Sequence, residues 1–119
     1  MLIIVDSDTG VEVASRVATA DTFFARLRGL LGTANLPAGQ GLLIPHCNSV
    51  HTIGMKYSID VLFLDKKLTV LKAVAYLAPY RMAVCWQAAM ALELTSGTID
   101  RAGLAAGHRL VANKKNTGL

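Results

Sequence analysis

The sequence predicts one mostly β domain that contains a single clear amphipathic helix. Its 119 residues are enough to bury one core and too few for two ordinary domains. Hydrophobic residues make up 53% of the chain and charged residues 17%, which is far from the composition of disordered proteins. Short apolar segments alternate with turn-forming residues along most of the chain, whereas only one segment has a clear helical period. We therefore treat residues 1–119 as a single domain.

The N-terminal part is predicted to form a hairpin, a helix and a short buried strand. Two apolar segments, "LIIVD" and "VEVASRV", flank residues 7–10, where Asp favours a turn and Gly accepts a positive φ. Helical periodicity predicts a helix over about residues 20–31, with Thr19 as its N-cap and Gly32 at its end. Apolar side chains at helical offsets form one face of this helix: Phe23, Phe24, Leu27, Leu30 and Leu31. After a loop that contains Pro and Gly, "LLIP" predicts the short strand.

The C-terminal part is predicted to add a central hairpin, a further strand and a short helix. "IDVLFLD" and "LTVLKAVAYL" are rich in β-branched and apolar residues, and "KK" joins them. Residues 86–94 contain helix formers, yet their side chains sort onto two alternating faces, which favours a strand. Thr98 is the expected N-cap of a short helix over about residues 98–103, and a final strand is expected from Arg109.

Charge and hydropathy argue against two classes of function. Lys and Arg exceed Asp and Glu by 12 to 8, but the cations are scattered, and Lys114 and Lys115 lie in the C-terminal tail. Without a basic stripe or interleaved aromatic residues, this small excess argues against a nucleic-acid partner. No apolar run approaches the roughly 18 to 20 residues that cross a bilayer, so we expect no membrane span.

The start of the chain and its cysteines indicate a cytoplasmic location. "MLIIVD" reaches an acid at its sixth residue and lacks the basic and apolar regions of a signal peptide. The two cysteines, Cys47 and Cys85, are too few for a disulfide framework and too widely spaced for a four-thiolate zinc site. We therefore expect a cytoplasmic protein whose thiols are reduced.

Four segments together resemble a known family. They are "RLRGLLG", "SVHTIGMKYSIDVLFLD", "APYR" and "LELTSGTIDRAGLAAGHRL", and the resemblance covers nearly the whole chain. The sequence is similar to the domain of unknown function 192 family, whose signature is a His-Thr-x-x-Met step followed by an Ile-Asp-Val-x-Phe strand. The resemblance implies a small β domain of sandwich or barrel type with one or two short helices, and it implies no established activity. This chain has Tyr80 where members often have Trp, and His108 where they often have Asp.

The segment "CNSVHTIGMKYSID", residues 47–60, concentrates the candidate site residues. Cys47, His51 and Met55 are four residues apart, so on a strand or a helix they would share one face. Thiolate, imidazole and thioether suit copper(I), and zinc accepts the first two, so copper or zinc is the alternative to our expectation of no cofactor. Cys85 would add a ligand if the fold brought it beside Cys47. The simpler interpretation is that Cys47 and Met55 are core residues and His51 is partly buried.

Nucleophilic catalysis is another interpretation of the same segment. Cys47 or Ser49 could act as the nucleophile, with His51 as its base and Asp60 orienting the imidazole. Ser49 and His51 share a strand face, but neighbours on one strand lie side by side, and no glycine-flanked elbow presents either nucleophile. Asp60 and Asp65 are five residues apart and fall on opposite strand faces, which argues against a paired-acid hydrolase. The sequence leaves open whether the protein is an enzyme.

Asp60 enters an apolar strand and therefore requires a partner, because a bare buried carboxylate is costly. We expect that partner to be Arg81, with Lys56 as the second choice. A structural ion pair is the preferred interpretation, and a catalytic acid is the alternative.

The sequence as a whole predicts a small soluble domain of uncharacterised function that binds a small ligand or a protein partner in a cleft. The candidate ligand-binding residues are Ser49, His51, Asp60 and Arg81. The alternative function is a metal- or thiol-dependent enzyme, whose candidate ligands are Cys47, His51, Met55 and Cys85.

Overall fold

The computed structural model describes residues 1–20 and 36–114, and these ranges are mostly β, as the sequence predicts. The strands are β1 (Leu2–Asp6), β2 (Glu12–Thr19), β3 (Gln40–Pro45), β4 (Ser49–His51), β5 (Ile59–Leu64), β6 (Val70–Leu77), β7 (Met82–Val84), β8 (Met90–Thr95) and β9 (Leu110–Lys114). A short helix, α2, spans Thr98–Ala102. Within these ranges, no helix has the length and hydrophobicity that a membrane crossing requires.

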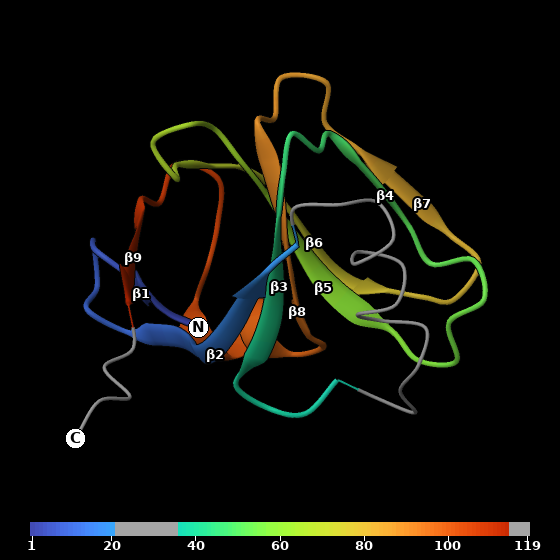
Figure 1. The fold of residues 1–119 in the computed structure, drawn as a ribbon, viewed down its shortest axis with the longest axis horizontal. Coiled ribbons are helices and arrows are strands. Elements are labelled where there is room, and N and C mark those ends of the chain that lie inside the picture. The colour runs from blue at the N-terminus through green and yellow to red at the C-terminus, as the bar shows by residue number, and fades with distance from the viewer. Residues whose placement is uncertain (21–35, 115–119) are drawn as a thin grey trace.

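Seven strands form one sheet that curls into a half-barrel (Figure 1). Their order is β6-β5-β8-β3-β2-β1-β9, and each neighbouring pair is antiparallel except β2 and β3. The two end strands meet where β6 and β9 begin: Thr69 forms a bridge with Arg109, and the Val70 N–H donates to the His108 carbonyl at 2.8 Å. We call this junction, residues 68–70 and 107–110, the seam.

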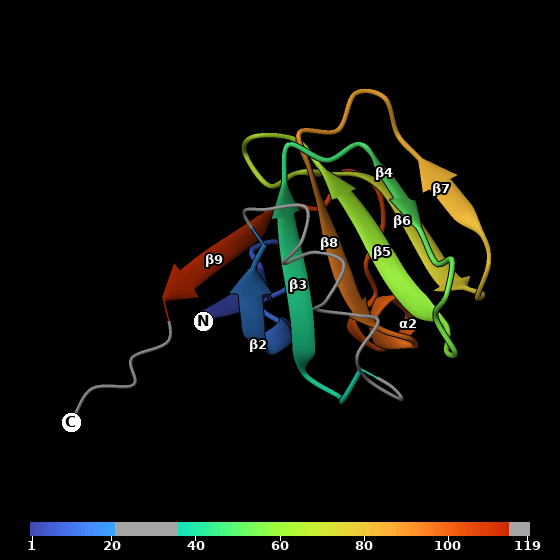
Figure 2. The same ribbon diagram turned by 45° about the vertical axis from the view of Figure 1, so that its right-hand side comes forward.

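The remaining strands, β4 and β7, form a separate antiparallel ribbon. Figure 2 shows the ribbon to the side of the large sheet, near β5 and β6, with β7 as the outermost strand. The chain runs from β4 through β5 and β6 before it returns in β7, so the ribbon joins segments that are about 30 residues apart. The ribbon therefore depends on the β5–β6 pair for its position.

Two clusters of buried side chains lie on the two faces of the large sheet. Leu62 and Leu64 of β5 belong to the first cluster, which also contains residues of β1, β2, β8, β9 and α2. Val61 and Phe63 belong to the second cluster, together with the inward side chains of β4 and β7. All six residues of β5 are buried, which explains why its sequence is nearly continuously apolar.

Most of the predicted strands are confirmed. The first hairpin turns at residues 7–10, and "LLIP" lies in β3. The ambiguous segment forms β8, in which Leu92 and Leu94 join the first cluster while Ala91 joins the second, as the alternation predicts. The β5–β6 hairpin also forms, but it lies at one end of the sheet rather than at its centre, because β6 is an end strand.

The predicted helix over about residues 20–31 falls almost entirely in a range outside the described residues. Its expected N-cap, Thr19, is the last residue of β2, where it pairs with Leu43 of β3. The second predicted helix is confirmed as α2.

The cap of α2 differs from the prediction. Gly97, with φ of 94°, occupies the N-cap position, and Thr98 is the first helical residue. The Thr98 hydroxyl donates to the Thr95 carbonyl at 2.7 Å. The Ile99 N–H is satisfied by a carboxylate from β5, that of Asp60, at 2.8 Å. A side chain 39 residues away in sequence therefore anchors the first turn of the helix to the sheet.

Candidate functional site

The β4–β7 ribbon has a buried side and an exposed side. Its register pairs Val50 with Ala83 and His51 with Met82. Val50 and Ala83 are buried in the second core cluster. Because successive side chains on a strand point to opposite faces, His51 and Met82 point away from that core, as does Ser49. The ribbon therefore presents one row of side chains outward.

Large apolar side chains lie on this exposed side and at its two ends. Met82 is 66% exposed on β7 itself. Ile53 and Tyr80, 58% and 67% exposed, flank the ribbon at one end, and Trp86, 73% exposed, follows β7 at the other. Isolated exposed apolar residues are ordinary, but a group that includes Trp, Tyr and Met is typical of interfaces. We call the following residues the ribbon face: His51, Ile53, Tyr80, Met82 and Trp86.

The two chain segments that contain the ribbon carry positive charge and no acidic residue. Residues 46–58 and 78–88 include Lys56 and Arg81, both exposed, and contain no Asp or Glu. Lys72 of β6 adds a cation beside the ribbon, because its ammonium donates to a carbonyl of β7 at 2.9 Å. The apolar side chains of the ribbon face thus lie among cations.

A buried threonine holds one end of the ribbon together. Thr52 is completely buried, and its hydroxyl donates to the Ala78 carbonyl at 2.6 Å. The same oxygen accepts the Arg81 N–H at 2.8 Å, and the Thr52 N–H donates to the Arg81 carbonyl. Tyr80 lies inside this set of bonds with a left-handed φ of 60°, and its N–H donates to the Thr52 carbonyl. The backbone that carries Tyr80 and Arg81 is therefore fixed by Thr52.

The structure separates the three soft ligands that were expected to share one face. Cys47 and Met55 are buried in the second core cluster, whereas His51 is exposed on the outer side of β4. Their spacing misleads because β4 is only three residues long, so that Cys47 precedes the strand and Met55 follows a turn. The Cys47 thiol donates to the Ser49 carbonyl at 3.0 Å.

Neither cysteine forms a disulfide bond. Cys85 is partly buried and packs against the core cluster that contains Cys47, and its N–H donates to the Asn48 carbonyl at 2.9 Å. Among the residues that the structure describes, no group of three His, Cys, Asp or Glu ligands at metal-binding separations includes Cys47, His51 or Cys85.

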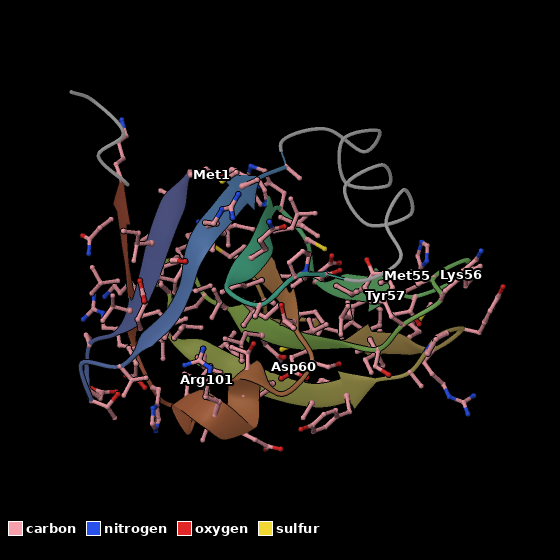
Figure 3. All side chains as sticks on the ribbon, turned by 90° about the horizontal axis from the view of Figure 1, so that it is seen from below. Met1, Met55, Lys56, Tyr57, Asp60 and Arg101 are labelled. Carbon is pink, nitrogen blue, oxygen red and sulfur yellow. The ribbon has the colours of Figure 1, made fainter. Side chains whose placement is uncertain are left out.

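Ser49 and His51 share the outer side of β4, as the strand alternation predicts. Asp60, the third member of the expected catalytic group, lies on β5 beside α2, as Figure 3 shows. Both of its carboxylate oxygens accept hydrogen bonds from other groups, described next, so Asp60 does not orient the His51 imidazole.

Asp60 is completely buried, and its partners are backbone groups. One oxygen accepts the Tyr76 N–H at 2.9 Å and the other accepts the Ile99 N–H at 2.8 Å. The expected ion pair with Arg81 or Lys56 is therefore wrong: both cations are exposed, and Lys56 lies on a loop well apart from Asp60 in Figure 3. Bonds from backbone N–H groups to a carboxylate are charge-assisted and satisfy it without a cation. Asp60 ties β6 and α2 to β5.

A second polar cluster, which the sequence did not reveal, lies at the seam. The buried Asp6 carboxylate is 2.7 Å from the Nδ1 atom of His108 and accepts the Asp8 N–H at 2.9 Å. Asp8 in turn accepts the Arg109 N–H at 3.1 Å. Asp6, Asp8 and His108 are the only three metal-ligating residues in the described ranges whose ligand atoms lie within 4.8 Å of one another. Their oxygens and nitrogen are engaged with each other and with backbone, which favours a structural role.

The pKa values in this cluster shift in the directions of an ion pair. Its hydrogen bond to Asp6 raises the pKa of His108 above 6.5, although burial opposes this effect. Burial alone would raise the pKa of Asp6, but the hydrogen bonds from His108 and the Asp8 N–H outweigh it, and the pKa lies below 3.8. No sequence signal could pair these residues, because 102 positions separate Asp6 from His108.

The curled sheet, the short helix and the exposed ribbon together define a small, mostly β domain of half-barrel type. The chain belongs to the domain of unknown function 192 family, described as Uncharacterized ACR, whose model matches residues 3–112. This membership confirms the resemblance noted in the sequence. The description of the family names no activity.

Comparison with individual proteins agrees with this assignment. A UPF0127 protein from Thermococcus sibiricus is 38% identical over 66 residues, which span 52% of this chain and 43% of that protein. A crystal structure of a Sinorhizobium meliloti 1021 protein, provisionally named a transcription regulator, has a TM-score of 0.78 at 20% identity and covers 93% of this chain and 91% of its own. A protein of unknown function from Novosphingobium aromaticivorans has a TM-score of 0.77 at 17% identity, with coverages of 92% and 82%. At these identities the two structures support the fold alone.

Proposed function

We propose that the protein is a binding module that docks an acidic segment of a partner protein on the ribbon face. The observation that carries this proposal is the combination of Tyr80, Met82 and Trp86, each more than 60% exposed, with flanking segments, residues 46–58 and 78–88, that hold cations and no acids. Aromatic residues, Met and Arg are enriched at protein interfaces. A partner of opposite charge would be steered to this side of the molecule.

The proposal keeps part of the predicted ligand-binding set. Ser49 and His51 lie on the outer side of β4, and Arg81 lies beside Tyr80 at the end of the ribbon. In this proposal they contact the partner as polar neighbours of the apolar side chains. Asp60 is left out, because both of its oxygens serve the interior of the fold.

Energetics favour the apolar side chains as the main contributors. Covering apolar surface contributes about 25 cal/mol per Å², whereas an exposed ion pair contributes only about 0.2 to 1 kcal/mol. Tyr80, Met82 and Trp86 should therefore set the affinity, and Arg81 and Lys56 should set the preference for acidic partners.

A peptide-binding measurement tests this proposal. A synthetic peptide of alternating Glu and Val would be titrated into the full chain, beside a peptide of alternating Lys and Val. We expect the acidic peptide to bind and the basic peptide to bind at least about fivefold more weakly. Tyr80→Ala and Met82→Ala should each weaken binding by about fivefold or more. Val111→Ala, on the exposed surface of β9, is the matched control and should bind as the wild type does.

Other occupants of the same face are outcomes of this test. Equal binding of both peptides would contradict the role assigned to the cations. Binding of single-stranded DNA or of anionic lipid vesicles in place of the acidic peptide, with the same dependence on Tyr80, would replace a protein partner by a nucleic acid or a membrane surface.

We keep a metal- or thiol-dependent enzyme that uses Cys47, His51 and Cys85 as the alternative. Its support is that Cys85 packs against the core cluster that contains Cys47 and that neither cysteine is held in a disulfide. Elemental analysis of protein purified without a tag would decide this point. Stoichiometric copper or zinc that is lost on Cys47→Ser would favour the enzyme over the binding module.

A further inference from the structure

The outer edge of β7 has a defined set of free backbone groups. The Cys85 N–H and the Arg81 carbonyl are both hydrogen-bonded toward the β4 chain. In an antiparallel pair, the residues between such positions turn their own N–H and C=O groups toward the opposite edge. For β7 these residues are Met82 and Val84. The N–H and C=O groups of these two residues therefore point away from β4.

This edge is not paired with another strand. Across the described part of the chain, β4 is the only strand that pairs with β7, and Figure 2 shows β7 as the outermost strand. The Val84 carbonyl accepts the Lys72 ammonium at 2.9 Å, whereas the backbone N–H and C=O of Met82 take part in no hydrogen bond with a described residue. Open edges of this kind are templates for an added strand, and lysine is a common guard against unwanted pairing.

We propose that the acidic partner segment binds as an extended strand that pairs with this edge of β7, an inference that rests on the proposed function. Strand addition provides backbone hydrogen bonds that any sequence can make, and alternate side chains of the added strand then provide specificity. Side chains on the outer face of the added strand would lie beside Met82, with Tyr80 and Trp86 at the two ends. The ribbon would thereby become a three-stranded sheet.

Lys72 adds to the preference for acidic segments that Arg81 and Lys56 provide, and it acts at the edge itself. Its ammonium now donates to a neutral carbonyl of β7. A carboxylate on the incoming strand offers a charge-assisted bond, which is shorter and stronger than a bond to a carbonyl. The lysine would therefore exchange the Val84 carbonyl for the partner's carboxylate, and the freed carbonyl would accept an N–H of the added strand. A neutral or basic segment offers no carboxylate, so the Lys72 ammonium would stay bonded to the Val84 carbonyl at the edge of β7.

The experiment uses the full chain and two peptides with the same alternating Glu and Val sequence. One peptide has an ordinary backbone, and the other carries a methyl group on every backbone nitrogen, so that it cannot donate hydrogen bonds. Amide hydrogen exchange of Met82 and Val84 is followed by NMR. We expect the ordinary peptide to slow exchange of both amides by about tenfold or more, and the methylated peptide to bind about tenfold more weakly.

Two results would overturn the inference, and they are distinguishable. If both peptides bound equally and Met82 and Val84 remained unprotected, docking on the ribbon face would stand and strand pairing would be excluded. If neither peptide bound, the proposed function would fail together with the inference. Lys72→Gln separates the charge argument from the pairing argument: protection of Met82 by the ordinary peptide should persist, while the preference for the Glu peptide over a matched Gln peptide should become smaller, with Arg81 and Lys56 supplying what remains.

Discussion

Asp6, Asp60 and Thr52 are polar side chains with no exposed surface, and each has at least one partner far away in sequence. Asp6 meets His108, Asp60 meets Ile99, and Thr52 meets Arg81. A buried polar group without partners destabilises the folded state, so each of these residues fixes where another segment must lie. At the scale of single residues, the fold is held in register by these three groups as well as by its apolar core.

The Asp60 carboxylate should contribute much more to the free energy of unfolding than an exposed carboxylate does. Asp60→Ala leaves the Tyr76 and Ile99 N–H groups without their acceptor inside the protein, and we expect a loss of about 3 kcal/mol in the free energy of unfolding. Denaturant melts would measure this loss. Asp100→Ala is the matched control: Asp100 is exposed and accepts one bond from the Tyr76 hydroxyl, so its replacement should cost less than about 1 kcal/mol. Similar losses for both variants would contradict the structural role of Asp60.

The His108 imidazole should make stability depend on pH. Its pKa is raised in the folded state by the hydrogen bond to Asp6. At pH values between the unfolded and folded pKa, the protein therefore takes up a proton when it folds. That contribution is complete below the ordinary value of 6.5 and is lost as the pH rises through the higher folded value. The pKa of Asp6 is lowered, so its contribution is present above its ordinary value of 3.8 and is lost as the pH falls through the lowered folded value. The pair therefore stabilises most between these two ordinary values.

Thermal melts of wild type and His108→Gln at a series of pH values test this expectation. Between about pH 6 and about pH 8, the wild type should lose more stability than the variant. Arg109→Gln, an exposed neighbour whose side chain does not titrate in this range, should keep the wild-type slope. Identical slopes for wild type and His108→Gln would show that the imidazole is not linked to folding.

At the scale of elements, strands with long periodic sequences were predictable and short ones were not. The alternation in "MALELT" identified β8 and both of its faces, because six residues give a readable period. β4 and β7 have three residues each, which is too short for a period, and no local signal pairs them across β5 and β6. The prediction that Cys47, His51 and Met55 share one face is wrong for the same reason. β4 covers only residues 49–51, so neither Cys47 nor Met55 lies on the strand.

The ribbon as an element should depend on Thr52. Thr52→Val keeps the volume but leaves the Arg81 N–H and the Ala78 carbonyl without their hydroxyl partner, so we expect a loss of about 2 kcal/mol. Amide hydrogen exchange should accelerate at Arg81 and Ala83 more than at residues of β5. Thr19→Val, at an exposed position of β2, is the control and should change both measurements little. Uniform acceleration across the protein would indicate global destabilisation and contradict a local role at the ribbon.

At the scale of the whole molecule, composition and resemblance were enough to predict the fold class. They were not enough to predict that the two ends of the sheet meet. The seam joins β6 to β9 through Thr69, Arg109 and the carbonyl of His108. These contacts join the two ends of the sheet, and no local pattern in the sequence indicates them. The partners of Asp60 were missed for a similar reason: a sequence suggests cations for a buried acid, whereas the fold supplied two backbone N–H groups.

NMR mapping of the acidic peptide on the whole protein tests the central claim most directly. Backbone amide shifts would be recorded for the full chain with and without the peptide of alternating Glu and Val. We expect the largest changes at residues 49–53 and 80–86 and a smaller change at Lys72, with the amides of Asp6 and His108 unchanged. Changes centred on the seam, or spread evenly over the sheet, would contradict the assignment of the ribbon face as the binding surface.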